Sequence, residues 1–290
     1  MTPPDHPLLF ALDLDGTLLD GAGRVSPRAV AALTSVVAVG HRVVIATGRP
    51  PDLAIRAAPE LVGLVSHVVG GNGTIISTFP ADAGDTADLV HVSGFDLAAA
   101  IEIVGELRRC DDGFGFALAT ERGFAHEPGF VERMPAAVHD DPIDDALSIG
   151  GTTAFKLLVF HLQRSVTELL VDVPPLIAHL GHAFSVRHMG ADAVEIGPAR
   201  DDKGAGLRWL CDHLGVASSH VVAVGDELND LTMLEWAGWG VAVANGDDRV
   251  RAAADEVIGS NLDDGVAVFM ERFDGTPTAG TDPQGDVKAP

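Results

Sequence analysis

Two aspartates stand two residues apart where the first hydrophobic segment of the chain ends. Residues 8–12 read Leu-Leu-Phe-Ala-Leu, and Asp13 and Asp15 follow them in the run Asp-Leu-Asp-Gly-Thr. Alternate side chains of a strand point to the same face, about 7 Å apart. Carboxylates at that spacing repel each other, and one of them tends to keep its proton. The pair therefore needs a partner that offsets the repulsion, and a metal ion is one.

Other polar residues stand at the ends of predicted elements in the same way. Thr47 closes a second hydrophobic strand, Lys203 opens a helical pattern, and Asp226, Asn229 and Asp230 follow the strand Val-Val-Ala-Val-Gly. In open parallel sheets the ligand crevice lies outside the carboxyl ends of the strands. Because three of these four groups, counting the first aspartate pair, sit at such ends, we expect them to converge in space.

The carboxylates of Asp13 and Asp226 suit Mg²⁺, which is usually held by one or two carboxylates together with phosphate and water. Sharing the ion would offset their repulsion and keep Asp13 ionised, as a nucleophile must be. Asp15 would then be free to exchange a proton, so that the two neighbouring aspartates have separate roles. Lys203 stands at a helix start, where the macrodipole disfavours a cation. An anion bound at the same helix end would explain the lysine.

The two outer parts of the chain alternate short hydrophobic strands with helical patterns. Residues 26–40, for example, begin with the capping Ser26 and Pro27 and end at Gly40, which are signals for both ends of a helix. Continuous hydrophobic strands that alternate with helices predict an α/β fold with a parallel sheet covered on both faces.

The middle of the chain, residues 83–190, has a different pattern. We expect helices at 95–110 and, with a proline break, at 165–181, and strands at 113–120, 152–162 and 182–190. This mixture predicts an α+β domain inserted into a discontinuous α/β core formed by 1–82 and 191–273. The final segment, 274–290, is rich in Pro, Gly and Thr and is expected to be disordered.

The overall charge limits the kinds of partner. The 290 residues include 42 acidic and 19 basic residues, a formal net charge of −23, which argues against nucleic acid or an anionic membrane as a partner. The N-terminus does not resemble a signal peptide, and no uncharged apolar run of about 18 residues is present. The two cysteines form no disulfide framework or metal-binding spacing, which favours a reducing compartment and hence the cytoplasm.

The ordered motifs resemble those of the haloacid dehalogenase superfamily, in its Cof-type (subclass IIB) phosphatase branch. The four segments that carry the resemblance are DLDGTLL, IATGR, DDKGAGL and GDELNDLTML. It extends over nearly the whole chain except the tail. The branch has an α/β cap inserted between its second and third motifs, so the resemblance implies a Rossmann-like core with an inserted cap.

For catalysis, the resemblance implies that Asp13 is the nucleophile that forms an aspartyl-phosphate and that Asp15 is the general acid and base. Asp13, Asp226 and the backbone carbonyl of Asp15 would bind Mg²⁺, with Asp230 supporting the metal. The enzyme would be a Mg²⁺-dependent phosphomonoester hydrolase acting on a small phosphorylated metabolite, such as a sugar phosphate or a phosphorylated vitamin or flavin intermediate.

The resemblance also implies a set of residues around the phosphoryl group. Thr47, Gly48, Lys203 and Asn229 would hold it, and Arg49 and Asn72 are candidates for substrate contact. From the residues alone, Arg49 could equally form a surface ion pair. The run Gly-Gly-Asn-Gly-Thr around Asn72 could equally be a tight turn with Asn72 or the next glycine at positive φ.

Two readings of the same motifs stay open beside hydrolysis. A phosphomutase would return the phosphoryl group to a sugar with the same Asp15, and a non-catalytic protein would only bind a phosphorylated metabolite. The sequence also departs from the family at Glu227 and Asp202, where many relatives have smaller or uncharged residues. Both residues add negative charge beside the candidate site and are expected to weaken its affinity for anions.

Overall fold

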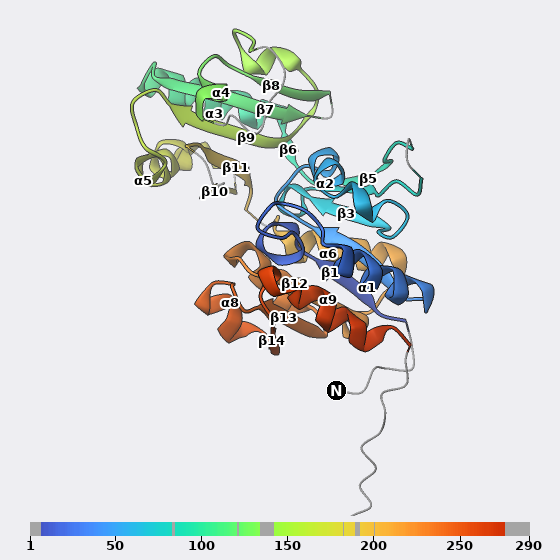
Figure 1. Ribbon diagram of the computed structural model, residues 1–290. Coiled ribbons are helices and arrows are strands. Elements are labelled where there is room, and N and C mark those ends of the chain that lie inside the picture. The colour runs from blue at the N-terminus through green and yellow to red at the C-terminus, as the bar shows by residue number, and fades with distance from the viewer. Residues whose placement is uncertain are drawn as a thin grey trace, which may run out of the picture.

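A large parallel sheet forms the body of the protein. The computed structural model describes residues 7–82, 85–120, 122–133, 142–181, 183–188, 192–199 and 201–275. The strand order is β14-β13-β12-β1-β2-β3-β4-β5, and the sheet lies in the lower half of Figure 1. Its strands are β1 (Leu9–Leu12), β2 (Arg42–Ala46), β3 (His67–Gly70), β4 (Ile75–Thr78), β5 (Leu89–Val92), β12 (Val221–Gly225), β13 (Trp239–Val243) and β14 (Glu256–Ile258). The strands from β14 to β3 are parallel, and β4 runs antiparallel to both of its neighbours, β3 and β5.

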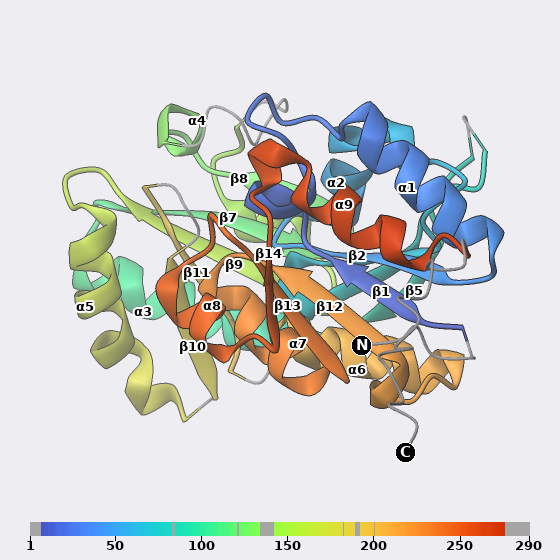
Figure 2. The same ribbon diagram turned by 60° about the horizontal axis from the view of Figure 1, so that its bottom comes forward.

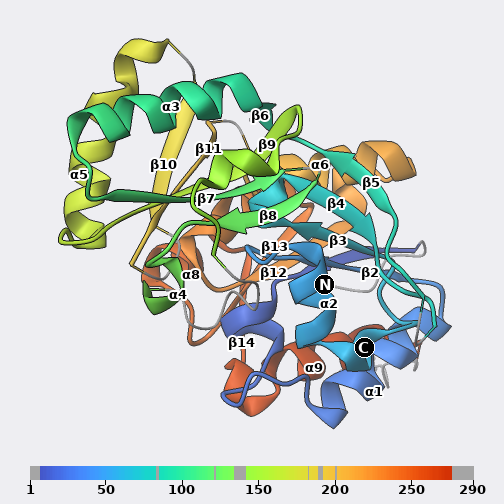
Figure 3. The same cartoon turned by 90° about the horizontal axis from the view of Figure 1, so that it is seen from above.

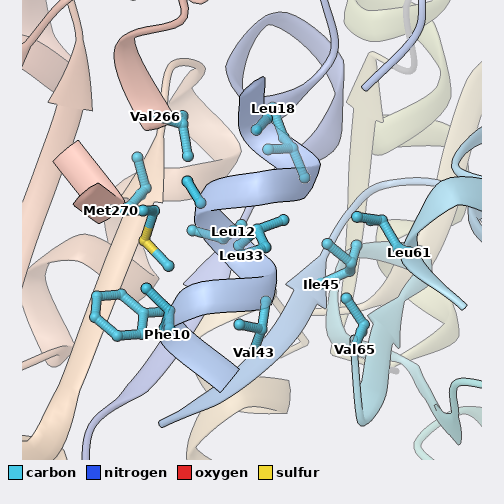
Figure 4. Packing of buried hydrophobic residues seen from close by; sticks show 14 of the residues in the cluster. Phe10, Leu12, Leu18, Leu33, Val43, Ile45, Leu61, Val65, Val266 and Met270 are labelled. Atoms are coloured by element: carbon cyan, nitrogen blue, oxygen red, sulfur yellow. The ribbon is translucent and has the colours of Figure 1, made fainter. Parts of the chain in front are cut away.

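Helices cover both faces of this sheet, as the hydrophobic strands predicted. The first face carries α1 (Pro27–Ala38), α2 (Pro51–Ala57) and α9 (Gly265–Met270), and the second carries α6 (Lys203–Leu214), α7 (Leu231–Trp236) and α8 (Asp248–Ala253). Figure 2 shows α1 and α9 on one side of β1 and β12 and α6 and α7 on the other. Alternate residues of β1 divide between the two cores. Phe10 and Leu12 face α1 and α9 (Figure 4), whereas Leu9 and Ala11 face α6 and α7.

A second, antiparallel sheet lies above the first in Figure 1. Its order is β10-β11-β9-β7-β8, with β6 paired to β9. The strands are β6 (Phe95–Asp96), β7 (Phe114–Thr120), β8 (Gly123–His126), β9 (Thr153–His161), β10 (Phe184–His188) and β11 (Val194–Pro198). The helices α3 (Leu97–Cys110) and α5 (Val166–Ile177) pack on one face, and α4 (Phe130–Arg133) lies on the other (Figure 3).

The chain changes sheet at different points from those expected. Strand β5 pairs with β4 in the large sheet although it lies within 83–190, and β11 pairs with β9 and β10 in the small sheet although it lies within 191–273. Both strands lack a continuous apolar run: β5 reads Leu-Val-His-Val at a sheet edge, and β11 carries Glu195. Their patterns therefore resemble connecting loops.

The predicted proline break in residues 165–181 is wrong. Helix α5 continues through Pro174 and Pro175 and ends at Ile177. Each proline removes one intrahelical hydrogen bond. The loss is tolerated because the prolines stand in the last turns and Leu169, Val173 and Ile177 still bury one face of the helix. The expectation for residues 276–290 concerns residues outside the described part of the chain. Among the described residues, no helix combines the length and apolar character needed to cross a membrane.

Candidate active site

Three neighbouring strands bring buried polar side chains to one edge of the large sheet. Asp13 follows β1, Thr47 follows β2 and Asp226 follows β12, and all three residues are buried. Since β12, β1 and β2 are adjacent and parallel, their carboxyl ends lie side by side. The convergence expected from the positions of these residues is therefore found for this group.

Lys203 joins this group from the first turn of α6. Its side chain is 1% exposed, and Nζ donates to Asp13 Oδ1 and to Asp230 Oδ1, both at 2.6 Å. Burial alone would lower the pKa of Lys203, but the two carboxylates outweigh burial and raise it. Lys203 is therefore a buried, charged counter-ion and not a solvent-facing residue.

The carboxylates of Asp13, Asp226 and Asp230 form a compact cluster, with one oxygen of each within 4.8 Å of the others. Burial raises the pKa of Asp13 well above its ordinary value, and the attraction to Lys203 opposes this rise. Burial likewise raises the pKa of Asp226 to about 6, although a hydrogen bond from Thr17 opposes it. With all three carboxylates ionised, the cluster and the Lys203 ammonium would sum to a charge of −2 among buried residues. A divalent cation would neutralise that charge.

Asp230 holds the turn that follows β12. Its Oδ2 accepts the backbone N–H groups of Asp226 and Glu227 at 2.9 and 3.0 Å, and its Oδ1 accepts from Lys203. Both oxygens are therefore already engaged, which suits a residue that fixes the cluster. The Glu227 side chain is exposed, and the Asp202 side chain accepts from the backbone N–H of Ala205 and so caps α6.

Asp15 turns away from the cluster. Its side chain is 54% exposed, and its two oxygens accept from Nε and Nη2 of Arg49 at 2.7 and 2.5 Å. The backbone changes direction here because Gly16 has a φ of +83°. Arg49 thus forms an ion pair near the surface, as one reading predicted, but its partner is the candidate acid.

The Thr47 hydroxyl has the contact expected of an ordinary strand end. Its oxygen accepts from the backbone N–H of Arg49 at 3.2 Å. Within the described residues, no acceptor for its own proton is found. The turn after β3 lies beside this loop, since the backbone N–H of Asn72 donates to the Thr47 carbonyl at 3.1 Å. Asn72 and Gly73 both have positive φ, as expected for a tight turn.

Two residues that support the cluster have no role among the sequence predictions. Thr17 donates to Asp226 Oδ1 at 2.7 Å, and Asn245 Nδ2 donates to the Gly16 carbonyl at 2.8 Å. A Cβ on Gly16 would come within 2.3 Å of Asp226 Oδ2, so glycine is required there. Thr17 stood in the quoted motif, and Asn245 follows β13. Asn245 is thus a polar residue just after a strand, which is the same signal in the sequence that marks Asp13 and Asp226.

Comparison with known proteins decides the family. A family model described as haloacid dehalogenase-like hydrolase matches residues 10–270. The chain belongs to this family. It is 30% identical over 279 residues to the 5-amino-6-(5-phospho-D-ribitylamino)uracil phosphatase YitU of Bacillus subtilis, covering 92% of this chain and 97% of that protein. It is 29% identical over 272 residues to the pyridoxal phosphate phosphatase YbhA of Escherichia coli, covering 90% of this chain and 97% of that protein.

The solved structures agree with this membership. A haloacid dehalogenase-like hydrolase from Bacteroides thetaiotaomicron has a TM-score of 0.78 at 25% identity, covering 92% of this chain and 99% of that one. The match to residues 10–270 includes all four motifs. The resemblance inferred from those motifs, the mixed α/β fold and the enzyme class are therefore confirmed. In this haloacid dehalogenase-like hydrolase, buried contacts among Asp13, Lys203, Asp226 and Asp230 join the first, third and fourth motifs.

Proposed function

We propose that this haloacid dehalogenase-like hydrolase is a cytoplasmic, Mg²⁺-dependent phosphomonoesterase that acts through an aspartyl-phosphate. The observation that carries the proposal is the buried cluster at the carboxyl ends of β1 and β12. There a lysine holds the Asp13 carboxylate at 2.6 Å, with the carboxylates of Asp226 and Asp230 beside it. The free thiols of Cys110 and Cys211 agree with a reducing compartment.

The cluster fits a small, hard cation. Its donors are carboxylate oxygens, the ligand type that Mg²⁺ prefers. The charge of −2 that the cluster carries with its carboxylates ionised would be balanced by a divalent ion. Asp13 and Asp226, with the backbone carbonyl of Asp15, would hold the ion, and Asp230 would keep both ligands in place through its bonds to Lys203 and the Asp226 N–H. When bound, Mg²⁺ would neutralise charge on the transferred phosphoryl group.

Asp13 is the nucleophile in this proposal. Lys203 occupies its Oδ1, which leaves its other oxygen to attack phosphorus. As the new oxygen–phosphorus bond forms, the bond from phosphorus to the leaving oxygen breaks, and Asp15 gives that oxygen a proton. Asp15 then takes a proton from the water that attacks phosphorus and frees Asp13. Because Arg49 engages both oxygens of Asp15, that ion pair must separate before Asp15 can donate.

The phosphoryl group would be held by donors on three sides. Thr47 offers its hydroxyl, Gly48 its backbone N–H, Lys203 its ammonium and Asn229 its carboxamide. Thr47 and Gly48 follow β2, Lys203 opens α6, and Asn229 lies in the turn after β12. Lys203 is fixed by two carboxylates, so it offers a positioned charge without a further loss of side-chain freedom.

The small sheet would act as a mobile cap over this site. The chain passes from β5 to β6 and returns from β11 to α6, and these two crossings touch, because Ser93 Oγ donates to Asp201 Oδ2 at 2.7 Å. Two adjacent connections of this kind form a hinge about which the small sheet and its helices can turn. Closure would exclude bulk water from the site during phosphoryl transfer.

The substrate is proposed to be a small phosphorylated metabolite: a sugar phosphate, or a phosphorylated vitamin or flavin intermediate. The names of the two relatives support this range, since one acts on a phosphorylated ribitylaminouracil and the other on pyridoxal phosphate. The four donors around the phosphoryl group need only a terminal monoester, whatever its leaving group.

A panel of phosphorylated metabolites assayed for phosphate release with Mg²⁺ tests the proposal. The Asp13→Asn variant is the control, because it keeps the size of the side chain and removes the nucleophile. We expect the wild type to release phosphate from at least one ester, and Asp13→Asn to remain folded and release none. Activity of Asp13→Asn within about tenfold of wild type would contradict the role of Asp13.

Two further measurements test the requirement for a metal ion and identify the molecule that receives the phosphoryl group. EDTA should abolish turnover, and Ca²⁺ should support it poorly because it prefers more ligands at longer distances. Full activity in EDTA would contradict the metal requirement. Transfer of labelled phosphate to a sugar instead of water would identify a phosphomutase, and binding without turnover would identify a binding protein.

A further inference from the structure

Asn72 connects two loops at the edge of the candidate site. It lies in the turn after β3, and its Oδ1 accepts from Nδ2 of Asn229, in the turn after β12, at 3.0 Å. Because β1 and β2 lie between β3 and β12 in the sheet, this hydrogen bond spans the ends of two strands. Those are the strands that lead to Asp13 and Thr47.

The backbone aims the Asn72 side chain. Its φ of 55° is in the left-handed region, which asparagine tolerates better than most residues. The turn is fixed on both sides: the backbone N–H groups of Gly71 and Asn72 donate to the carbonyls of Arg49 and Thr47. A Cβ on Gly73 would lie 2.0 Å from the Asp202 carbonyl oxygen, so the turn also packs closely on the start of α6.

The carboxamide of Asn72 lies over Gly48. A Cβ on residue 48 would come within 3.2 Å of Asn72 Oδ1, closer than most such contacts. A side chain at position 48 would therefore require the Asn72 carboxamide to shift slightly. The loop after β2 and the turn after β12 are therefore held at one separation by Asn72 and by the missing side chain of Gly48.

The hydrogen bond between Asn72 and Asn229 also links the turn after β3 to the charged cluster. Asn229 directly precedes Asp230, which accepts from Lys203 and from the backbone N–H groups of Asp226 and Glu227. A change in the position of Asn229 would therefore move the residue that orients Lys203 and Asp226.

We propose that Asn72 is a positioning residue that sets the width of the phosphoryl site through Gly48 and Asn229. The inference rests on the proposed phosphatase function and goes beyond it by assigning Asn72 to the phosphoryl side of the reaction and not to the leaving group. It replaces the expectation of direct substrate contact by Asn72. Because Asn72 acts through Asn229, losing Asn72 in a protein that already lacks the Asn229 carboxamide should cause no further loss.

A double-mutant cycle tests this coupling. The variants are Asn72→Gly, which keeps the left-handed backbone accessible, Asn229→Ala, and the double variant. We expect each single change to lower kcat/KM and to weaken inhibition by inorganic phosphate by about threefold to tenfold, the range of one neutral hydrogen bond. The double variant should lose no more than the larger single loss.

Two further comparisons separate positioning from other roles. The losses should be equal for p-nitrophenyl phosphate and for an alkyl phosphate, because the Asn72–Asn229 pair acts on the phosphoryl group that both esters share. The matched control is Asp264→Gly, since Asp264 is the other described non-glycine residue with positive φ, at 56°, and it lies at the start of α9. This control should leave kcat/KM unchanged.

Each contrary result has its own meaning. Losses that multiply in the double variant would refute the coupling between Asn72 and Asn229. A loss that differs between the two esters would show that Asn72 contacts the leaving group of the substrate. An equal loss in Asp264→Gly would show a general backbone effect and overturn the assignment. Wild-type protein that releases no phosphate from any ester would instead refute the proposed function, and this inference with it.

Discussion

Replacing Asp226 by asparagine is expected to stabilise the protein when no divalent cation is present. Burial raises the pKa of Asp226 to about 6, so its ionised form, which dominates at neutral pH, destabilises the folded state. Asparagine removes the charge and keeps an oxygen that can accept the hydrogen bond from Thr17. The same change removes a proposed Mg²⁺ ligand, so stabilisation by Mg²⁺ should be lost.

The size of the effect follows from the pKa of Asp226. A change from 3.8 to about 6 corresponds to about 3 kcal/mol. We take about 2 kcal/mol, because the small exposed part of Asp226, 6% of the residue, lets water screen part of the charge. At about 2–4 °C per kcal/mol, Asp226→Asn should raise the thermal midpoint by about 4–8 °C in EDTA at pH 7.5.

The raised pKa of Asp226 also determines how the free energy of unfolding changes with pH. The folded state holds a proton on Asp226 that the unfolded chain releases near pH 4, so the free energy of unfolding of the wild type falls as pH rises from about 4 to about 6. The advantage of Asp226→Asn should therefore be absent below pH 4, grow across that interval and stay constant above pH 6. Mg²⁺ at about 100 times its Kd should raise the stability of the wild type by about 2.7 kcal/mol at pH 7.5. The rise should be smaller at pH 5, because Asp226 must then lose a proton to bind the ion.

Thermal unfolding in EDTA and in Mg²⁺, at pH 5 and 7.5, measures both effects. Asp212→Asn is the matched control, because Asp212 is an exposed aspartate on α6. This control should leave the midpoint and its response to Mg²⁺ unchanged. A lower midpoint for Asp226→Asn in EDTA would refute the reasoning from burial. A response to Mg²⁺ that persists in this variant would show that the ion binds elsewhere.

Two other substitutions test the remaining charged groups. Lys203→Met leaves Asp13 and Asp230 buried without their cation, so the free energy of unfolding at pH 7.5 should fall by about 3–5 kcal/mol; an unchanged denaturation midpoint would contradict the buried ion pairs. Asp15→Asn should lower single-turnover phosphorylation by an alkyl phosphate by about 10²–10⁴-fold. It should affect p-nitrophenyl phosphate much less, because nitrophenolate leaves without a proton; equal losses on both esters would exclude Asp15 as the general acid.

The sequence was most informative where a segment is buried on both faces or ends in a recognisable signal. Strands β1, β2 and β12 are continuous hydrophobic runs, and α1 begins at Pro27 after the cap Ser26, whose hydroxyl accepts from the N–H of Ala29. Edge and mixed strands such as β5 and β11 carry no such run, so only their partners identify them. Helix α5 shows the reverse case: burial of one face keeps a helix that its two prolines would interrupt in isolation.

Some positions in the candidate site could likewise be predicted from the sequence, and others could not. The positions of Asp13, Thr47 and Asp226 at strand ends predicted their convergence, because the ends of adjacent parallel strands must be neighbours. Spacing alone did not predict that Asp15 leaves this group, since the turn at Gly16 redirects the chain. The partners of Asp15 and Asn72 come from loops far away in sequence, and no local pattern encodes such contacts.

Lys203 shows how a local conflict in a sequence can indicate a site. A cation in the first turn of a helix costs about 0.3–1 kcal/mol through the macrodipole, and burial of its side chain costs more. Hydrogen bonds to charged partners contribute about 1.5–3 kcal/mol each, and Lys203 makes two, at 2.6 Å. The tertiary partners therefore outweigh the local penalty. Asp202 caps the helix through the Ala205 N–H but explains nothing about a lysine beside it. A residue that violates a local rule without a local remedy is held there by partners elsewhere in the fold, and here those partners are the proposed nucleophile and the residue that supports the metal ligands.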